Sequence, residues 1–285
     1  MQVYSIETEQ FRLDGGAMFG VVPKVIWNNL NPADENNLCP WSMRCMLVVE
    51  GNRKILIDTG MGNKQSEKFF SHYYPFGNAT LLTSLQAHGF NTEDITDVIL
   101  THLHFDHCGG AVSLINGAYK PTFPNAIYWT SAEHWKWATD PNSREKASFL
   151  KENIMPLLDS GQLKFVEEIA EQRTVFSDHI EILFAYGHTK SMMIPIITMG
   201  DGTKLVYMAD LIPSSMHIPL PYIASYDMFP MKTLEEKEEF LGEAVNKNYV
   251  LFFEHDPQCI CCTVQKTEKG FRIKDLIRLD ELGIS

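Results

Sequence analysis

Short apolar runs that alternate with polar turns dominate the chain, and runs of this length are typical of β-strands. A Gly-Asn pair at 51–52 separates two of them and predicts a β-hairpin over 46–57. The runs that we expect to form strands are 3–8, 11–14, 46–49, 55–57, 95–100, 126–130, 162–166, 180–185, 194–199, 204–208 and 250–253. The chain is therefore predicted to be rich in β-structure.

Helical periodicity interrupts these strands in several places. Within 80–88, Leu81, Leu82 and Leu85 form one apolar stripe, and Gly89 follows as a stop signal. The other predicted helices are 131–138, 143–158 and 234–245. Because strands occur in runs with helices between them in both halves, we predict an α+β protein in which two sheets pack together beneath outer helices. No repeat or long linker divides the chain, so we expect a single domain over 1–285.

The composition limits the kinds of molecule that the protein is expected to bind. The chain has 285 residues, of which 45% are hydrophobic and 21% charged, values typical of a globular protein with a substantial core. Its formal net charge of −12 disfavours binding to nucleic acid or to an anionic membrane. Residues 1–7 lack the features of a signal peptide, and no stretch approaches the roughly 18 apolar residues of a membrane span. We therefore expect a cytoplasmic protein that acts on a small molecule.

The six cysteines include three close neighbours, Cys259, Cys261 and Cys262. Such a cluster is compatible with metal binding or redox chemistry as well as with ordinary reduced thiols on a strand. We favour reduced thiols, and we keep a thiol or redox protein that uses these three residues as the alternative from another functional class.

The densest group of metal-ligating side chains is His102, His104, Asp106 and His107, within six positions. His102 and His104 are two residues apart, so on an extended segment both side chains leave the same face. Asp106 and His107 follow where the chain turns, and Gly109-Gly110 then lets the backbone come close to the site. Imidazole and carboxylate groups suit zinc and similar divalent metals, and four ligands exceed the need of one catalytic zinc with an open position. The run therefore predicts two neighbouring metals.

Two metals need further ligands, and three residues are placed to supply them. His188, Asp210 and His255 each follow a predicted strand, and loops at strand ends commonly carry catalytic residues. We predict that all three complete the metal site. The other histidines are expected on the surface or in the core, and His217 is the one among them that we expect nearest to the substrate.

These residues, together with Asp58 in the segment Leu56-Ile57-Asp58-Thr59-Gly60, resemble the metallo-β-lactamase superfamily of hydrolases in both order and setting. The resemblance implies a four-layer αββα sandwich, the metallo-β-lactamase-like fold, with the metals at one edge. The implied first metal site is His102, His104 and His188. The implied second site is Asp106, His107 and His255. Asp210 would bridge the two metals, and Asp58 would orient a ligand from outside.

Particular positions indicate the branch of the superfamily. The β-lactamases usually carry Cys where this chain has Asp210, and the diiron oxygen-reducing branch usually has Glu where it has His104. The acidic charge disfavours the RNA-processing branches. What remains resembles the quorum-quenching lactonases and the methyl parathion hydrolases, in which a segment like 14–20 lies over the metals.

The function implied is hydrolysis of an ester or lactone carbonyl, foremost an N-acyl homoserine lactone, by a hydroxide that bridges two metals. Zinc is the expected metal, with manganese, iron or cobalt as alternatives. Asp106 and Asp210 are the expected proton carriers. Well-known lactonases place a Tyr three residues after the bridging Asp, where this chain has Pro213. The residues that we expect to contact substrate are Met18, Phe19, His217, Tyr222 and Tyr226.

A phosphotriester or aryl-ester hydrolase of the methyl parathion type is the alternative, since it would use the same metals. A homodimer is typical of the branch and is also expected here.

Overall fold

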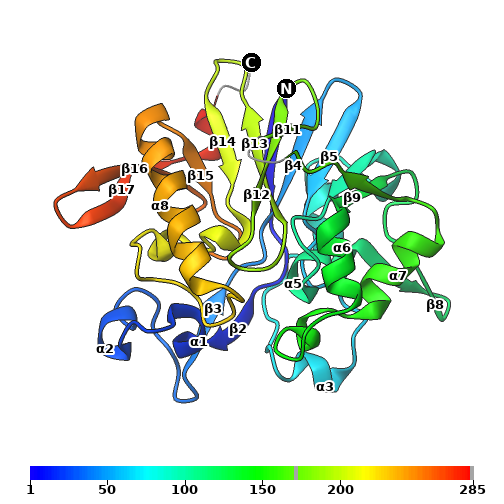
Figure 1. Cartoon of the computed structure of the whole chain (residues 1–285). Coiled ribbons are helices and arrows are strands. Elements are labelled where there is room, and N and C mark those ends of the chain that lie inside the picture. The colour runs from blue at the N-terminus through cyan, green and yellow to red at the C-terminus, as the bar shows by residue number, and fades with distance from the viewer. Residues whose placement is uncertain (170–172, 283–285) are drawn as a thin grey trace.

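Two β-sheets stand face to face in the centre of a computed structural model that describes residues 1–169 and 173–282 (Figure 1). The first sheet has the order β1 (Gln2–Ile6), β4 (Cys45–Glu50), β5 (Arg53–Ile57), β6 (Asp97–Ile99), β9 (Ile127–Ser131) and β10 (Leu163–Val166). The second has the order β11 (Thr174–Val175), β12 (Ile180–Ala185), β13 (Met192–Thr198), β14 (Lys204–Tyr207), β15 (Val250–Phe252), β16 (Cys261–Thr267) and β17 (Gly270–Ile277). Two small hairpins pair β2 (Phe11–Asp14) with β3 (Leu38–Trp41), and β7 (Val112–Ile115) with β8 (Ala118–Pro121).

Helices cover the outer faces of both sheets. The helices are α1 (Gly15–Phe19), α2 (Lys24–Trp27), α3 (Glu67–Phe70), α4 (Leu81–Ala87), α5 (Phe105–Cys108), α6 (Ala132–Thr139), α7 (Lys151–Asp159) and α8 (Pro230–Lys247). In Figure 1, α8 lies on one side of the sheets and α6 and α7 lie on the other. This arrangement confirms the predicted four-layer αββα sandwich. Among the residues described, no helix is both long and apolar enough to cross a membrane.

Alternation along the strands builds the core. In β4, Val48 packs into the cluster shared by the two sheets, whereas Leu47 faces the cluster beneath α4 and α7. The neighbouring β5 divides in the same way, with Ile57 inward and Leu56 outward. Successive side chains of a strand point to opposite faces, so each strand contributes to two layers. Burying a side chain of this kind contributes about 1.5–3 kcal/mol, which makes these alternating strands the main source of stability.

The predicted hairpin is confirmed, since β4 and β5 pair in antiparallel register from Met46↔Ile57 to Glu50↔Arg53. The helix predicted over 143–158 is wrong in its first half, because the α-helix begins at Lys151. Glu145 is buried, and its carboxylate accepts hydrogen bonds from the Trp137 indole and the Thr189 hydroxyl. These bonds turn the segment inward before the helix can begin. The hairpin of β16 and β17 is absent from the predicted strand runs, although the cysteines of β16 were expected on a strand.

Candidate metal centre

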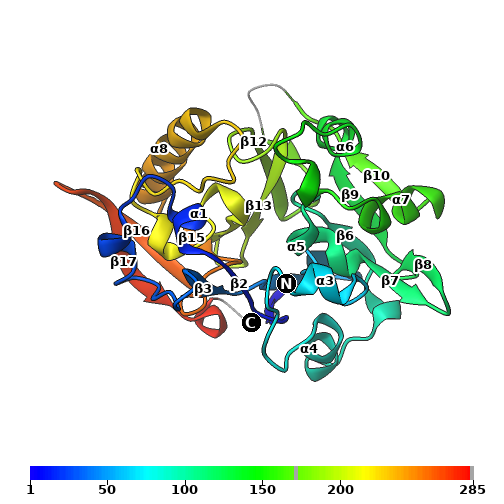
Figure 2. The same cartoon turned by 90° about the horizontal axis from the view of Figure 1, so that it is seen from below.

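The carboxyl ends of five strands meet at one edge of the sandwich, the lower edge in Figure 1. In the first sheet, β5 and β6 run parallel, and in the second sheet β14 and β15 do so. The carboxyl ends of parallel strands lie at the same edge of a sheet. The loops that follow these strands and β12 carry the predicted site residues. Figure 2 looks at this edge, with α1 and α5 near its middle.

Three histidines form the first group of converging ligand atoms. His102 Nε2 lies 3.0 Å from His104 Nδ1, and His188 Nε2 lies 3.1 Å from the same atom. All three side chains are buried, and together they form a group able to hold a metal ion. Two zinc–nitrogen bonds of about 2.0–2.1 Å at a tetrahedral angle place the nitrogens about 3.3 Å apart. The spacing therefore fits one shared cation.

A second group joins Asp106, His107 and His255. His255 Nε2 lies 3.2 Å from His107 Nε2 and 3.8 Å from Asp106 Oδ2. The segment of α5 supplies Asp106 and His107 from adjacent positions, as the sequence led us to expect. This second group also has the donor chemistry that a divalent metal takes up.

Asp210 lies between the two groups. Its Oδ2 is 3.2 Å from His188 Nε2, and its Oδ1 is 3.2 Å from His255 Nε2. Oδ1 is buried and has no hydrogen-bond partner, which is costly for a carboxylate oxygen unless a cation satisfies it. The residues present therefore fit divalent cations, and all seven residues predicted as ligands meet here, with Asp210 between the two groups.

Each ligand histidine has a partner for its other ring nitrogen. His104 Nε2 faces Glu145 Oε1 at 2.9 Å, and His188 Nδ1 faces Asp227 Oδ1 at 2.8 Å. The Nδ1 atom of His255 lies 2.7 Å from the Ser42 carbonyl oxygen. Such partners are nearly universal for metal-binding histidines, because they fix the tautomer and the orientation of the ring.

Asp58 contacts the other ring nitrogen of His107, and these two residues form a further buried cluster with Glu254. Its Oδ2 lies 3.1 Å from His107 Nδ1 and accepts a hydrogen bond from the Thr101 hydroxyl at 2.7 Å, while Oδ1 accepts one from the Thr101 amide at 2.8 Å. Asp58 has a φ of 57°, and Ala209, directly before Asp210, has a φ of 42°. Left-handed backbone costs energy for residues other than glycine and is concentrated at functional sites.

Two glycines bring the backbone close to the ligand run, as predicted. A Cβ atom on Gly109 would lie 2.0 Å from the Met61 carbonyl oxygen, and one on Gly110 would lie 2.2 Å from that of Thr59. Real Cβ atoms do not approach oxygen so closely. Glycine at both positions therefore lets α5 dock against the loop after β5.

Burial and neighbouring charges set the protonation of the site. Burial and the nearby rings of His107 and His104 hold the pKa of His102 well below its ordinary value, which leaves a neutral imidazole. Burial alone would raise the pKa of Asp210, but the charges of His255, His188 and His107 outweigh it and hold that pKa well below its usual range. Burial lowers the pKa values of His255, His188 and His107, but neighbouring carboxylates outweigh burial and raise all three, that of His255 to about 9. Metal binding at these three histidines therefore displaces protons, because a ligand imidazole must be neutral.

A cavity of about 440 Å³ opens above the ligands. Among the residues predicted to contact substrate, Met18 and Tyr226 line it. Phe19, His217 and Tyr222 do not belong to its wall. Phe19 stacks on His217 at 4.9 Å between ring centroids, and both rings are fully buried. Phe19 and His217, which the sequence assigned to substrate contact, are therefore part of the interior packing around α1.

His217 is held as a structural residue by both of its ring nitrogens. Nδ1 lies 2.7 Å from the Ser214 hydroxyl oxygen, and Nε2 lies 2.9 Å from the Met18 carbonyl oxygen. Because Met18 itself lines the cavity, His217 supports the wall from behind.

The sequence of this chain identifies its family. Residues 42–255, more than half of the chain, match the model of the metallo-beta-lactamase superfamily. The chain belongs to the metallo-β-lactamase superfamily. The predicted fold and the prediction of a metal-dependent hydrolase are thereby confirmed.

Relatives of this superfamily member include lactonases. An N-acyl homoserine lactonase of Bacillus cereus is 24% identical over 241 residues, which cover 80% of this chain and 86% of that protein. A probable metal-dependent hydrolase from Staphylococcus aureus aligns with a TM-score of 0.86 at 27% identity, over 100% of this chain and 97% of that one. The dizinc quorum-quenching lactonase AidC, solved with a product, aligns with a TM-score of 0.76 at 25% identity, over 97% of this chain and 95% of that one.

Sequence reasoning missed several residues of the site. Glu145 and Asp227, the partners of His104 and His188, lie in loops where no periodicity or spacing marks them. Tyr73 and Arg144 line the cavity from segments far from the ligand run. Glu254 directly precedes His255, and its Oε2 lies 3.0 Å from His107 Nδ1. That adjacency to a predicted ligand is the one signal that would have found it.

Proposed function

We propose that this superfamily member is a dinuclear metal-dependent hydrolase of lactones, with N-acyl homoserine lactones as its foremost substrates. The observation that carries the proposal is the position of Asp210 between two complete ligand groups. The AidC structure contains two zinc ions and a homoserine product, and the Bacillus cereus relative is named for the same reaction. We take zinc as the metal on the strength of that likeness. The homodimer and the cytoplasmic location stay predictions.

The residues that would hold the ions are the seven predicted ligands. Divalent ions at such a site supply Lewis-acid activation of water and of a substrate carbonyl. Asp106 lines the cavity as well as the second ligand group, so its carboxylate can take a proton from the attacking water and return it to the departing alcohol. Asp210 is the second proton carrier in this proposal, since it too lines the cavity.

Tyr226 takes the place of the tyrosine that lactonases carry three residues after the bridging Asp. Pro213 occupies that position and also lines the cavity, where it has no side-chain donor. Tyr226 lines the cavity and is 41% exposed; partial burial, the neighbouring Tyr73 and the charge of Asp106 raise the pKa of its phenol, which is the protonated form. Burial, with the same Asp106 charge, raises the pKa of Tyr73 to about 12. Two phenol O–H groups are therefore available to orient a carbonyl or leaving oxygen.

The remaining wall of the cavity is largely apolar. It includes Leu13, Met18, Phe105, Ala224 and Met228. A volume of about 440 Å³ matches the lower half of the usual range for small-molecule pockets. These features favour a short acyl chain beside a polar lactone ring.

Turnover of N-hexanoyl-L-homoserine lactone by the zinc-loaded protein tests the proposal, with an aryl phosphotriester as the competing substrate. The expected result is a kcat/KM for the lactone that exceeds the phosphotriester value by orders of magnitude. A higher value for the phosphotriester would replace the lactonase by the alternative hydrolase. Turnover that survives removal of all metal would overturn both.

A further inference from the structure

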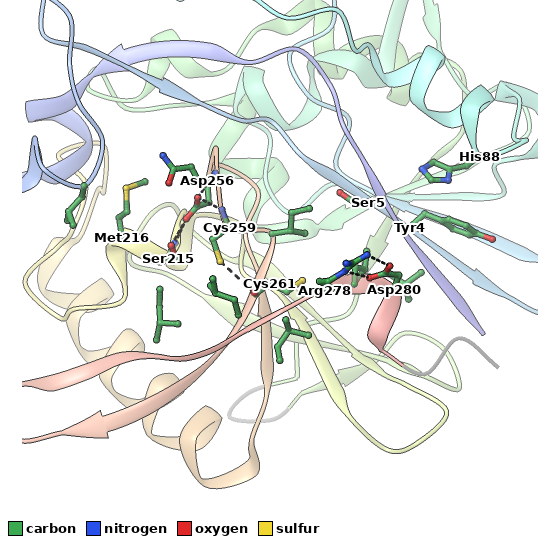
Figure 3. A pocket seen from close by; sticks show the side chains of 18 residues that line it. Tyr4, Ser5, His88, Ser215, Met216, Asp256, Cys259, Cys261, Arg278 and Asp280 are labelled. Carbon is green, nitrogen blue, oxygen red and sulfur yellow. Dashed lines mark hydrogen bonds and ion pairs between the residues drawn. The ribbon is translucent and has the colours of Figure 1, made fainter.

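A second groove lies beyond the turn that carries His255. It has a volume of about 840 Å³ and is lined in part by Ser215, Asp256, Cys259 and Cys261 (Figure 3). Apolar residues of β17 and its neighbourhood, including Leu276 and Ile277, form much of the remaining wall. His255 lines the metal cavity, whereas the next residue lines this groove. The short turn that contains His255 and Asp256 therefore contributes to the walls of both the metal-site cavity and the second groove.

Cys259 is the accessible thiol of this groove. The other five cysteines are buried, whereas Cys259 is partly exposed. Figure 3 shows its sulfur at the groove beside Ser215 and Asp256, with a contact of 3.5 Å from Sγ to the Cys261 carbonyl oxygen. Cys261 also lines the groove but is buried, so Cys259 offers the more accessible thiol to a small molecule there.

Cys262 provides a partner thiol. Cys259 and Cys262 are separated by two residues, the C-x-x-C spacing of dithiols that form disulfides. A side-chain interaction with Cys262 is the largest influence on the pKa of the Cys259 thiol, so the two thiols are neighbours. Cys262 lies on β16, which pairs with β15 directly before the ligand loop.

The electrostatic setting distinguishes Cys259 from the other thiols. The hydrogen bond from Cys262 leads the effects that lower the pKa of the Cys259 thiol despite its partial burial. Burial raises the pKa of Cys39 to about 11 and that of Cys108 to about 12. Because the thiolate is the nucleophile in disulfide exchange, reactivity is concentrated at Cys259.

We propose that Cys259 and Cys262 form a thiol–disulfide exchange site that accepts small organic disulfides from the apolar groove and closes to an internal disulfide. This inference goes beyond the proposed hydrolase function; the exchange chemistry does not depend on that function, whereas the coupling to metal binding rests on it.

The exchange proceeds in two balanced steps. The Cys259 thiolate attacks one sulfur of the small disulfide, the S–S bond breaks, and one thiolate leaves. Once Cys259 is part of the mixed disulfide, Cys262 loses its proton to water, and the Cys262 thiolate attacks the Cys259 sulfur and expels the second small thiolate. The protein loses two hydrogens and is oxidised, while the small disulfide is reduced to two thiols.

The dithiol is connected to the metal ligand through Asp256. Asp256 Oδ1 accepts hydrogen bonds from the Gln258 amide at 2.8 Å and the Cys259 amide at 2.7 Å, and Oδ2 accepts one from the Ser215 amide at 2.9 Å. A disulfide draws the sulfurs to about 2.05 Å and so moves this turn. Since His255 directly precedes Asp256, we infer that oxidation weakens metal binding.

The test treats the folded, metal-loaded protein with 4,4′-dithiodipyridine and follows the released thiopyridone and the intact mass. Wild type is expected to release two thiopyridones per chain rapidly, lose two hydrogens and retain no adduct. Cys262→Ser should release one and keep one thiopyridyl group. Cys259→Ser should react only as slowly as the buried thiols, while the control Cys39→Ser should behave as wild type.

Three results would overturn the inference. They are rapid reaction of Cys259→Ser, a stable adduct on wild type, or a disulfide mapped to another cysteine pair in digests of the wild-type protein. The last measurement needs no variant and so does not depend on variant folding. Metal content after gel filtration tests the coupling between dithiol oxidation and metal binding. We expect the affinity for metal to fall on the order of tenfold on oxidation and to recover when a thiol reductant is added. Unchanged affinity in the oxidised protein would refute the coupling.

Discussion

At the scale of single residues, Asp210 has the most demanding role, because one carboxylate contacts ligands of both groups. Asp210→Asn keeps the size of the side chain but removes its charge and one acceptor oxygen. We expect loss of at least one of the two ions and a fall in lactone kcat/KM of more than about a hundredfold. Elemental analysis and steady-state kinetics measure both. The matched control is Asp201→Asn on an exposed turn, and an equal effect there would contradict the assignment.

Tyr226 is assigned a contact with the substrate and none with the metals. Tyr226→Phe removes one hydroxyl and leaves the apolar wall in place. We expect kcat for the lactone to fall by about tenfold to a hundredfold, which corresponds to the loss of one hydrogen bond to a charge-bearing oxygen. Metal content should not change. Tyr119→Phe, at an exposed tyrosine of β8, is the control, and wild-type kcat in Tyr226→Phe would remove this residue from the mechanism.

His217 predicts a pH dependence of stability. Burial lowers the pKa of His217 to about 3, whereas the unfolded value is about 6.5. The unfolded state therefore binds more protons between these values, so stability is present above pH 6.5 and lost as the pH falls below it. Relative to His217→Gln, wild type should lose about 2 kcal/mol of unfolding free energy between pH 7 and 5. Urea unfolding at both pH values measures this, and a constant difference would contradict it.

At the scale of elements, the docking of α5 depends on glycine. Gly110→Ala would place a methyl group 2.2 Å from the Thr59 carbonyl oxygen, so the backbone must move. We expect a loss of about 1–3 kcal/mol in unfolding free energy, together with weaker metal binding. Gly242→Ala in α8 is the matched control, because its Cβ meets nothing within 4 Å and alanine favours a helix by about 1 kcal/mol. Equal effects of the two substitutions would refute the close-approach argument.

Elements with strong periodicity could be predicted from the sequence, and those shaped by the site could not. The hairpin of β4 and β5 follows from two apolar runs and a Gly-Asn turn. The beginning of α7 did not follow, because Glu145 is drawn into the site by partners far away along the chain. Propensity cannot anticipate a tertiary hydrogen bond of that kind.

The same division applies to the candidate site. The run from His102 to His107 could be singled out from the sequence, because packing offers little reason for three histidines and an aspartate within six positions. The residues of the cavity wall were harder to predict, because an aromatic residue in a loop can pack in the core as readily as it can contact a substrate. Phe19 and His217 illustrate this, because they stack on one another inside the protein. Tyr73 was missed because nothing in its segment relates it to the ligand run.

At the scale of the whole molecule, the sandwich brings five loops to one edge, where their histidine and aspartate side chains converge. In the absence of cations, the buried Oδ1 atom of Asp210 would have no hydrogen-bond partner. Metal binding should therefore stabilise the fold as well as supply the chemistry. We expect removal of metal with a chelator to lower the Tm, and re-addition of zinc to restore it. An unchanged Tm would mean that the ligand groups are stable without cations.

Elemental analysis of protein purified without chelators decides whether the two ligand groups hold metal. The account predicts about two divalent ions per chain in wild type, and loss of metal when His104, in the first group, or His255, in the second, is replaced by alanine. Wild-type protein without bound metal, or full metal content in both variants, would contradict it.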